Sequence, residues 1–233
     1  MSVSEQPAVI INARLSSTRL PRKVLRPIHG QEMLLHQIDR IKLCQNVGPI
    51  IIATSDREDD EDIATLCKRE GLNCFRGSLD DVAGRMLGAA TFVEASAFIR
   101  LSGDSPFLDP SLVDTLSNIF QAAQCDLATN IQLRTFPKGQ SVEVISVEAL
   151  SAAHKDMNAL EREHVTPYFY RNENHYKIVN LTSGKDFGDI QLSVDTPEEF
   201  EMADRLFSQF LNPLAVTGWE EITKLYLDLK PND

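Results

Sequence analysis

The chain has 233 residues and a mass of 26.1 kDa, with 42% hydrophobic and 24% charged residues. This composition is ordinary for a folded globular protein and excludes a fibrous repeat or wholesale disorder. Its 23 Lys and Arg residues are outnumbered by 34 Asp and Glu residues, so the formal net charge is −11. We therefore expect no sequence-independent binding of nucleic acid or of an anionic membrane, because both require clustered positive charge.

The charge is distributed unevenly along the chain. Residues 6–31 contain no acidic residue and hold five basic ones, Arg14, Arg19, Arg22, Lys23 and Arg26. The other 18 basic and all 34 acidic residues lie elsewhere, where the net charge is −16. A positive segment in an acidic protein predicts a small polyanion site, since a nucleic-acid backbone needs a broader basic surface. Solvated side chains on a loop are the alternative.

Cysteine spacing and the N-terminus bear on the cellular compartment. The four cysteines, Cys44, Cys67, Cys74 and Cys125, lack zinc-binding spacing and are expected to be free thiols in a reducing compartment. Residues 1–7 lack the basic start and apolar core of a signal peptide, and no apolar run is long enough to span a bilayer. These features predict a soluble, cytoplasmic protein.

In the first half of the chain, short β-branched runs alternate with segments of helical period. This pattern predicts a parallel sheet covered by helices on both faces. The strands are expected at residues 8–12, 49–54, 72–75 and 97–102, and the helices at 32–44, 58–70, 79–94 and 110–123. We attribute the acidic run at residues 58–62 to the dipole of the second helix rather than to a metal site.

The second half has shorter strands, expected at residues 141–146, 176–181 and 190–194. Helices are expected at residues 147–154, 163–171, 197–210 and 218–227. There is no flexible linker, low-complexity segment or internal repeat. The sequence therefore predicts a single α/β domain, residues 1–233, with a subdomain inserted at about residues 129–189.

Ligands of open α/β sheets bind beyond the carboxyl ends of the strands. The segment after the first strand reads ARLSSTRLPRK, residues 13–23. Its three hydroxyl residues and their backbone amides, flanked by basic side chains, are typical of a triphosphate site. Such cations would stabilise the negative charge that builds up during phosphoryl or nucleotidyl transfer. Neither the dinucleotide fingerprint nor the common phosphate loop occurs in the chain.

Two aspartates, Asp104 and Asp195, each follow an expected strand. Carboxylates that converge from separate strands suit Mg²⁺, which takes oxygen ligands from the protein and from phosphates together. Each Asp also precedes a Ser-Pro or Thr-Pro pair, so helix or turn capping is the alternative for either residue alone. Their shared position beside the basic segment favours a site for a metal ion and a triphosphate.

Six segments of this chain, in this order, closely resemble the cytidylyltransferases that make CMP-activated acidic sugars. They are ARLSSTRLPRKVL, FRGSLDDVAGRM, RLSGDSPFLDPSLVD, RTFPKGQSVEV, EREHVTPY and SVDTPEEF, and they span residues 13–200. The resemblance is strongest to the spore coat polysaccharide protein F group. The CMP-3-deoxy-manno-octulosonate and CMP-acylneuraminate synthetases are more distant relatives.

This resemblance implies a three-layer α/β/α nucleotide-diphospho-sugar transferase fold, Rossmann-like, with a mostly parallel sheet. It implies a homodimer formed through the inserted subdomain. The implied reaction joins CTP and an acidic sugar, such as a 2-keto-3-deoxy octulosonate or nonulosonate, to give a CMP-sugar and pyrophosphate. Such a product would serve the biosynthesis of surface polysaccharide or glycan.

By match of motif, the resemblance implies that Arg14, Arg19 and Lys23 act on the triphosphate during catalysis, and that Asp104 and Asp195 bind Mg²⁺. The residues implied to bind the nucleotide are Ala13, Arg14, Ser16, Ser17, Thr18, Ser78, Asp81 and Arg85. The sugar hydroxyl would attack the α-phosphorus directly, without a covalent enzyme intermediate.

The residues expected near the acceptor are Arg134, Lys138, Gln140, Glu143, Glu163 and His164. Arg134 suits a bidentate contact with a carboxylate, and Glu143 suits hydrogen bonds from sugar hydroxyls. Glu163 and His164 are expected to open a helix, so anchoring that helix or forming a dimer contact is their alternative role.

Some positions depart from the pattern of the family, and these departures leave the acceptor sugar and the level of activity open. Ser16 and Arg22 stand where Gly is usual, Gln191 replaces a basic residue, and Gln140-Ser141 replaces an apolar-acidic pair. Two alternative hypotheses are that the protein is a glycosyltransferase of similar fold or a nonenzymatic nucleotide-binding protein. A glycosyltransferase would place a D-x-D at a strand end, whereas residues 60–62 fall in the first turn of an expected helix.

Overall fold

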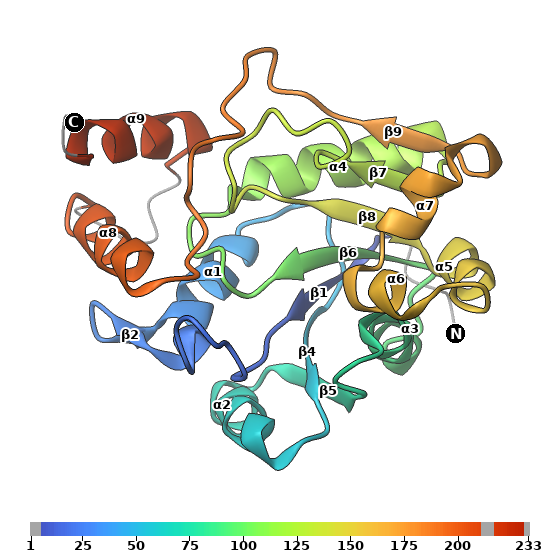
Figure 1. The fold of residues 1–233 in the computed structure, drawn as a ribbon, viewed down its shortest axis with the longest axis horizontal. Coiled ribbons are helices and arrows are strands. Elements are labelled where there is room, and N and C mark those ends of the chain that lie inside the picture. The colour runs from blue at the N-terminus through green and yellow to red at the C-terminus, as the bar shows by residue number, and fades with distance from the viewer. Residues whose placement is uncertain (1–5, 211–216, 231–233) are drawn as a thin grey trace.

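The computed structural model describes residues 6–210 and 217–230. Residues 1–5, which belong to the segment predicted not to be a signal peptide, lie outside the described residues. Within the described residues a seven-stranded sheet has the order β5-β4-β1-β6-β8-β7-β9 (Figure 1). Its strands are β1 (Ala8–Asn12), β4 (Ile50–Ser55), β5 (Asn73–Gly77), β6 (Ala97–Ser102), β7 (Leu127–Thr129), β8 (Glu143–Ser146) and β9 (Ile178–Asn180). Neighbouring strands are parallel except where β8 pairs with β6 and with β7.

The central strand β1 is buried on both faces. Val9 and Ile11 point into one hydrophobic core, whereas Ala8 and Ile10 point into the other. A strand covered on both faces reads as a continuous apolar run, which explains why AVIIN shows no alternation of polar residues. Because this signal is strong, the predicted bounds of β1 agree with the structure.

Helices cover both faces of the sheet, so the molecule has three layers and the predicted α/β/α fold class is confirmed (Figure 1). On one face lie α1 (Met33–Ile41), α2 (Glu61–Glu70), α4 (Pro110–Ala123), α8 (Pro197–Phe207) and α9 (Trp219–Leu229). On the other lie α3 (Val82–Phe92), α5 (Val147–His154), α6 (Ala159–His164) and α7 (Pro167–Arg171). Short 3-10 helices are η1 (Lys23–Leu25), η2 (Glu58–Asp60) and η3 (Glu173–His175).

The sequence analysis missed the shortest strands. β7 has three residues, too few to show a period. β2 (Pro27–Ile28) and β3 (Gln31–Glu32) form a small antiparallel hairpin outside the main sheet. Strands β8 and β9 come from residues 129–189 yet pair within the main sheet, and the treatment of this segment as an inserted subdomain stays a prediction.

The strand predicted at residues 190–194 is wrong. The structure has an extended segment here whose one bridge joins Gln191 to Lys138. Its backbone hydrogen bonds go to loops, with Leu192 N–H donating to the Lys138 carbonyl and Val194 N–H to the Asp104 carbonyl, each at 2.9 Å. Leu192 and Val194 are buried, so the segment has the alternating pattern of a strand without a neighbouring strand.

The single helix predicted at residues 163–171 is also wrong. α6 ends at His164 and α7 begins at Pro167, with Val165 between them at φ 69°. The positive φ of Val165 takes the backbone out of the helical region, and Pro167 lacks the N–H that would continue the helical hydrogen bonds across this point. Glu163 and His164 consequently close a helix instead of opening one.

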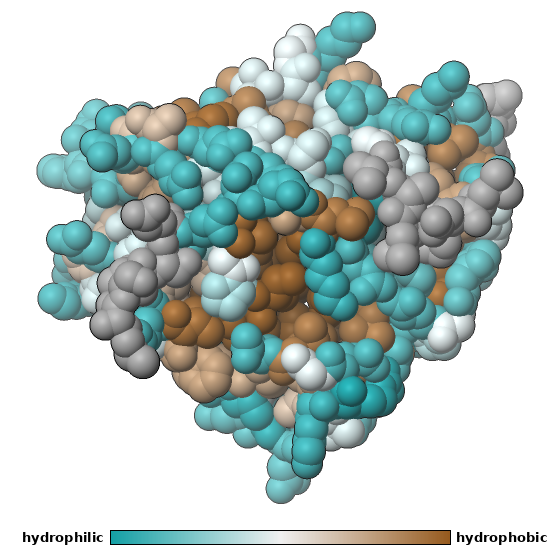
Figure 2. Space-filling view, turned by 180° about the vertical axis from the view of Figure 1, so that it is seen from behind, coloured by the Kyte–Doolittle hydropathy of each residue, from teal (hydrophilic) through white to brown (hydrophobic). Residues whose placement is uncertain are grey.

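The surface differs from region to region. Figure 2 shows the face opposite to that of Figure 1, where hydrophobic residues gather near the centre and hydrophilic residues surround them.

Among residues 6–210 and 217–230, no helix combines the length and the apolar character needed to cross a membrane.

Candidate active site

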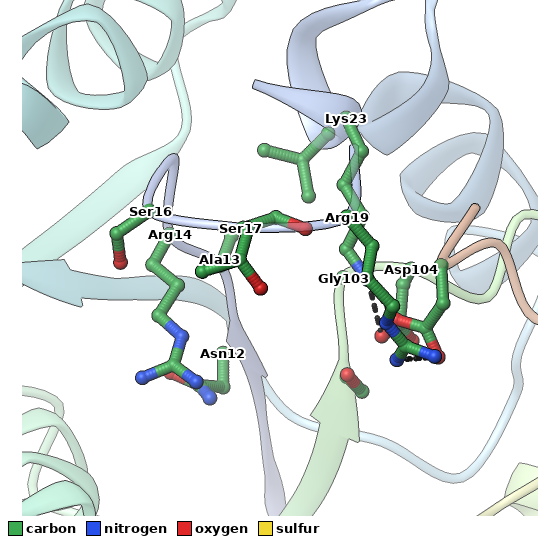
Figure 3. Close-up of a pocket in the computed structure, with 13 residues that line it drawn as sticks. Asn12, Ala13, Arg14, Ser16, Ser17, Arg19, Lys23, Gly103 and Asp104 are labelled. Carbon is green, nitrogen blue, oxygen red and sulfur yellow. Dashed lines mark hydrogen bonds and ion pairs between the residues drawn. The ribbon is translucent and has the colours of Figure 1, made fainter. Parts of the chain in front are cut away.

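A pocket of about 330 Å³ lies at the carboxyl ends of β1 and β6, and we call it the first pocket (Figure 3). Ligands of α/β sheets bind at this end of the strands. Its lining residues are Asn12, Ala13, Arg14, Ser16, Ser17, Thr18, Arg19, Lys23, Val24, Ser102, Gly103, Asp104 and Asp195. The pocket thus unites the basic segment after β1 with both predicted metal ligands.

The segment of residues 13–23, which we call the triphosphate loop after the role predicted for it, turns around the backbone of Leu15. The carbonyl of Leu15 accepts the N–H of Ser17 at 2.9 Å and that of Arg22 at 3.2 Å. In Figure 3, Ser17 lies between Arg14 on one side and the group of Arg19 and Lys23 on the other, and Ser16 lies beyond Arg14. The loop therefore presents the Ser17 hydroxyl between two positively charged regions.

Lys23 lies between the two aspartates. Its side chain is 11% exposed, and its Nζ donates to Asp104 Oδ2 at 3.0 Å, to Asp195 Oδ1 at 2.6 Å and to the Val194 carbonyl at 2.9 Å. Arg19 adds a second contact to Asp195, at 3.3 Å (Figure 3). The opposite charges bring the loop and the two aspartates together.

The backbone fixes Asp195 independently of Lys23. Thr196 and Glu199 form a capping box at the start of α8, and Glu199 Oε2 accepts the N–H of Asp195 at 2.6 Å. The neighbouring Val194 N–H donates to the Asp104 carbonyl at 2.9 Å. Both carboxylates are therefore held on rigid backbone at one edge of the first pocket.

A second pocket of about 420 Å³ adjoins the first and shares Arg19, Ser102, Asp104 and Asp195 with it. Its other lining residues are Ser105, Arg134, Lys138, Gly139, Ser141, Gln191, Ser193 and Glu199. Arg134 donates to the Ser141 hydroxyl at 3.1 Å. The structure thus places the predicted acceptor residue Arg134 next to the predicted metal ligands.

The backbone of the second pocket is tightly packed at Gly139, whose φ is +94°. A Cβ atom at this position would lie 2.6 Å from Ser193 N and 2.7 Å from Leu192 C. A side chain is excluded both by this contact and by the left-handed backbone. Gly139 therefore allows the turn at residues 138–139 to contact the extended segment that leads to Asp195.

A third pocket of about 430 Å³ shares Arg14 with the first. Its other lining residues are Leu79, Asp80, Ala159, Leu160 and Glu163. Arg14 and Glu163 are 3.8 Å apart, and both side chains are more than 40% exposed. Glu163 accordingly lies beside the triphosphate loop and outside the second pocket.

The family model of the cytidylyltransferases matches residues 8–228, a range that contains the triphosphate loop and both aspartates. The chain belongs to the cytidylyltransferase family. The predicted resemblance and the predicted enzyme class, a nucleotidyltransferase, are both confirmed.

This cytidylyltransferase is 33% identical over 225 residues to the spore coat polysaccharide biosynthesis protein SpsF of Bacillus subtilis (strain 168), covering 93% of this chain and 92% of the relative. A cytidylyltransferase structure from Leptospira borgpetersenii serovar Hardjo-bovis (strain JB197) is similar at a TM-score of 0.90 and 26% identity, covering 96% and 94% of the two chains. A CMP:2-keto-3-deoxy-manno-octonic acid synthetase complexed with CTP shares the fold at a TM-score of 0.68 and 19% identity, covering 88% and 99%.

Three residues predicted to bind the nucleotide, Ser78, Asp81 and Arg85, line none of the three pockets of this cytidylyltransferase. Arg85 is buried and donates to Asn12 Oδ1 at 2.7 Å and to the carbonyl of Ser78. Burial lowers the pKa of Arg85, and the nearby Arg14 guanidinium lowers it further. Arg85 thus joins residue 78 to the end of β1, and any effect on the nucleotide would pass through Asn12.

Asp81 is the N-cap of α3 and accepts the N–H of Gly84 at 2.9 Å. Its carboxylate also contacts His154 Nε2 at 2.8 Å and Arg162 at 3.4 Å. Partial burial acts to raise the pKa of Asp81, but the Gly84 N–H, His154 and Arg162 together hold it below its ordinary value. Asp81 therefore links α3, α5 and α6.

Two predicted acceptor residues, Gln140 and Glu143, are buried with partners inside the protein. Gln140 accepts the N–H of Asp109 at 2.9 Å and donates to the Phe107 carbonyl at 2.8 Å. Glu143 contacts the Arg100 guanidinium and accepts the Tyr170 hydroxyl at 3.1 Å. Neither side chain lines any of the three pockets, and His164 is exposed at the end of α6.

Sequence reasoning missed Asn12, Ser102 and Gly103, which also line the first pocket. Asn12 and Ser102 are the last residues of β1 and β6. A signal was present, because the strand ends had been located and the last residue of a strand belongs to the ligand-binding edge.

Proposed function

We propose that this cytidylyltransferase transfers CMP from CTP to a hydroxyl group of an acidic sugar, of the 2-keto-3-deoxy sugar acid class, for polysaccharide biosynthesis. One observation carries the proposal: the hydroxyl-rich, basic triphosphate loop and a pocket containing Arg134 meet at the same pair of aspartates. The names of the SpsF relative and of the CTP-complexed synthetase support the pathway and the substrate class.

The triphosphate loop suits the phosphates of CTP. Arg14 and Arg19 are exposed at the pocket, Ser17 lies between them, and Ser16 also lines the pocket. Charge-assisted hydrogen bonds from guanidinium and hydroxyl groups are the contacts that bind phosphate oxygens. We assign the triphosphate to the first pocket, with the Ser17 segment as its cradle, and the base to the side of Arg14.

Asp104 and Asp195 would hold a divalent cation such as Mg²⁺, which would neutralise phosphate charge during transfer. The donor set fits this ion, since two carboxylate groups face one pocket and leave the remaining ligands to phosphate and water oxygens. The Lys23 ammonium between them shows that this edge accommodates positive charge. Within the described residues, no cluster of three or more His, Cys, Asp or Glu side chains is arranged around a metal ion.

In the transfer itself, an acceptor hydroxyl attacks the α-phosphorus and the bond to pyrophosphate breaks. Lys23 and Arg19 are placed to stabilise the negative charge of the reacting phosphates, because both lie at the edge shared with the aspartates. The protein orients the two substrates in line and needs no covalent intermediate.

The second pocket suits the acceptor. Arg134 presents a planar guanidinium that can bind a carboxylate through two hydrogen bonds, and Lys138 adds a second positive charge. Gln140 and Glu143 would act indirectly, by fixing the loop at residues 107–109 and the Arg100 side chain. Glu163 and His164 lie at the end of α6, and Glu163 is next to Arg14. An acceptor in the second pocket would have to extend past Arg14 to contact them.

We also propose that the protein is a cytoplasmic homodimer that associates through residues 129–189. Leu133 and Leu160, each 63% exposed, are the large apolar side chains of this segment that such an interface would cover. Sedimentation of the wild-type protein and of the Leu133→Glu, Leu160→Glu double variant tests the assembly. A wild-type monomer would refute it.

The function is tested by pyrophosphate release with a divalent cation, each of CTP, UTP, ATP and GTP, and a panel of sugar acids. We expect release only with CTP and a suitable acid. Asp104→Asn should reduce this release by about 10²-fold or more while the melting temperature shows a folded protein. Unchanged activity in Asp104→Asn would refute the metal assignment, and CTP binding without turnover would favour a nonenzymatic nucleotide-binding protein.

No observation favours a glycosyltransferase. The two carboxylates of the D-x-D at residues 60–62 have different partners. Asp60 is buried against the backbone of Leu15, whereas Asp62 is exposed and pairs with Arg22 at 2.6 Å. They do not converge on one ligand.

A further inference from the structure

Asp60 is the buried carboxylate of an otherwise exposed acidic segment, residues 58–62. It is 1% exposed, and its side chain does not cap α2, which begins at the next residue. The helix dipole accounts for the exposed neighbours. It does not account for Asp60, because a carboxylate withdrawn from water needs hydrogen-bond partners of its own.

The partners of Asp60 join two segments that are distant in sequence. Asp60 Oδ1 accepts the N–H of Leu15 at 2.7 Å. Asp60 Oδ2 accepts the N–H of Ser55 at 3.2 Å and also the Ser55 hydroxyl. Both carboxylate oxygens are therefore used to connect the triphosphate loop with the end of β4, through charge-assisted hydrogen bonds.

Leu15 is the residue around which the triphosphate loop turns. Its side chain is buried in the core, its N–H donates to Asp60, and its carbonyl accepts the N–H groups of Ser17 and Arg22. Lys23 follows Arg22 directly and begins η1. A shift of the Leu15 backbone would therefore move both the Ser17 hydroxyl and the start of the segment that carries Lys23.

We propose that Asp60 is a positioning residue of the triphosphate loop, which acts through the Leu15 backbone to hold Ser17 and Lys23 in place before the nucleotide binds. Asp60 does not line the first pocket, so it acts without touching the nucleotide. The inference rests on the proposed function in one respect, namely that the nucleotide is CTP. A preformed loop lowers the ordering cost of binding, and this is the advantage that Asp60 supplies.

The experiment compares Asp60→Ala and Asp60→Asn with two matched controls. Asp59→Ala removes the exposed neighbour of Asp60, and Ile63→Val loosens the core under the same helix while keeping the hydrogen bonds of Asp60. Hydrogen exchange over residues 13–23 reports loop order. Calorimetry with CTP and a divalent cation reports affinity, at a temperature where every variant is folded by thermal melting.

We expect Asp60→Ala to speed exchange at the amides of Leu15, Ser17 and Arg22 and to weaken CTP binding about tenfold, the effect of losing a hydrogen bond to a charged group. Asp60→Asn should lie between Asp60→Ala and the wild type, since one amide oxygen remains for Leu15 while an NH₂ group meets the Ser55 N–H. Both controls should resemble the wild type within about twofold in CTP affinity.

Equal loop exchange and equal CTP affinity in Asp60→Ala and Ile63→Val would overturn the proposal. Should Asp60→Ala fail to fold, Asp60→Asn and Ser55→Ala serve in its place, and loop exchange unchanged in both would overturn it equally. Faster exchange in a protein whose wild type binds no CTP would support the positioning role and refute the proposed nucleotide. Loop order and nucleotide identity are thus tested separately.

Discussion

The first and second pockets share two aspartates but differ in the partners of their basic side chains. In the first, Lys23 is 9% exposed and lies within 3.0 Å of both carboxylates. In the second, Arg134 has a hydroxyl partner, and Lys138 is exposed without an ion-pair partner among the described residues. Lys23 is therefore already paired inside the protein, whereas Arg134 and Lys138 remain for a ligand.

This difference separates the residues that we assign to the reaction from those that we assign to recognition of the acceptor. Paired and buried charges keep their geometry without a ligand, which is the condition for stabilising charge during a reaction. Cations without a carboxylate partner gain most from an incoming anion. Of the positions predicted to depart from the family pattern, Ser141 and Gln191 line the second pocket, whereas Ser16 lines the first.

The largest expected effect is that of Lys23→Ala. Its loss leaves Asp104 without its cation and Asp195 with Arg19 alone, and removes the charge that we assign to the reacting phosphates, so kcat for pyrophosphate release should fall about 10²- to 10³-fold. Lys42→Ala is the matched control, since Lys42 is exposed on the surface beyond α1. A kcat within about twofold of the wild type would remove the distinction between the two pockets.

A smaller and more selective effect is expected for Arg134→Ala. Loss of the guanidinium should raise KM for the sugar acid about 10- to 100-fold and leave KM for CTP unchanged, because we assign the two substrates to different pockets. Arg134→Lys should recover only part of this loss if the contact is bidentate. Steady-state kinetics with each substrate varied in turn measure the two KM values. Arg69→Ala, at the exposed end of α2, is the control. A rise in KM for CTP would contradict the assignment.

The smallest expected effect is that of Ser141→Ala. It removes the hydroxyl that orients Arg134, and KM for the sugar acid should rise about two- to fivefold, as for one neutral hydrogen-bond acceptor. In the Arg134→Ala background the same change should have no effect, because its partner is already absent. Additive effects in the double variant would show that Ser141 acts on the acceptor by itself.

The sequence predicted the ligand-binding edge well because the signals there are local. β1 and β6 have the predicted bounds, and the segments that follow them contain the triphosphate loop and Asp104. Buried apolar runs of this kind depend on residues that are adjacent in the chain. The pairing of Lys23 with Asp195, 172 residues apart, was expected only as a shared position in the fold.

The predictions failed where the outcome depends on distant partners. The apolar pattern at residues 190–194 records burial, and burial is the same whether the neighbour is a strand or a loop. The sequence could not show that Gln140 bonds to the backbone at residues 107 and 109, or that Glu143 meets Arg100. Asp60 was missed for the same reason, since its partner Leu15 is 45 residues away.

The contact of Gly139 with Ser193 and Leu192 has a consequence for changing the acceptor preference. Because no side chain fits at Gly139, the path of the main chain along this wall is fixed, and the outline of the pocket cannot be altered by moving it. A change in acceptor preference must therefore come from the side chains on this backbone, at Ser141, Gln191 and Ser193. A library restricted to these positions would search acceptor chemistry while leaving Asp195, the proposed metal ligand, in place.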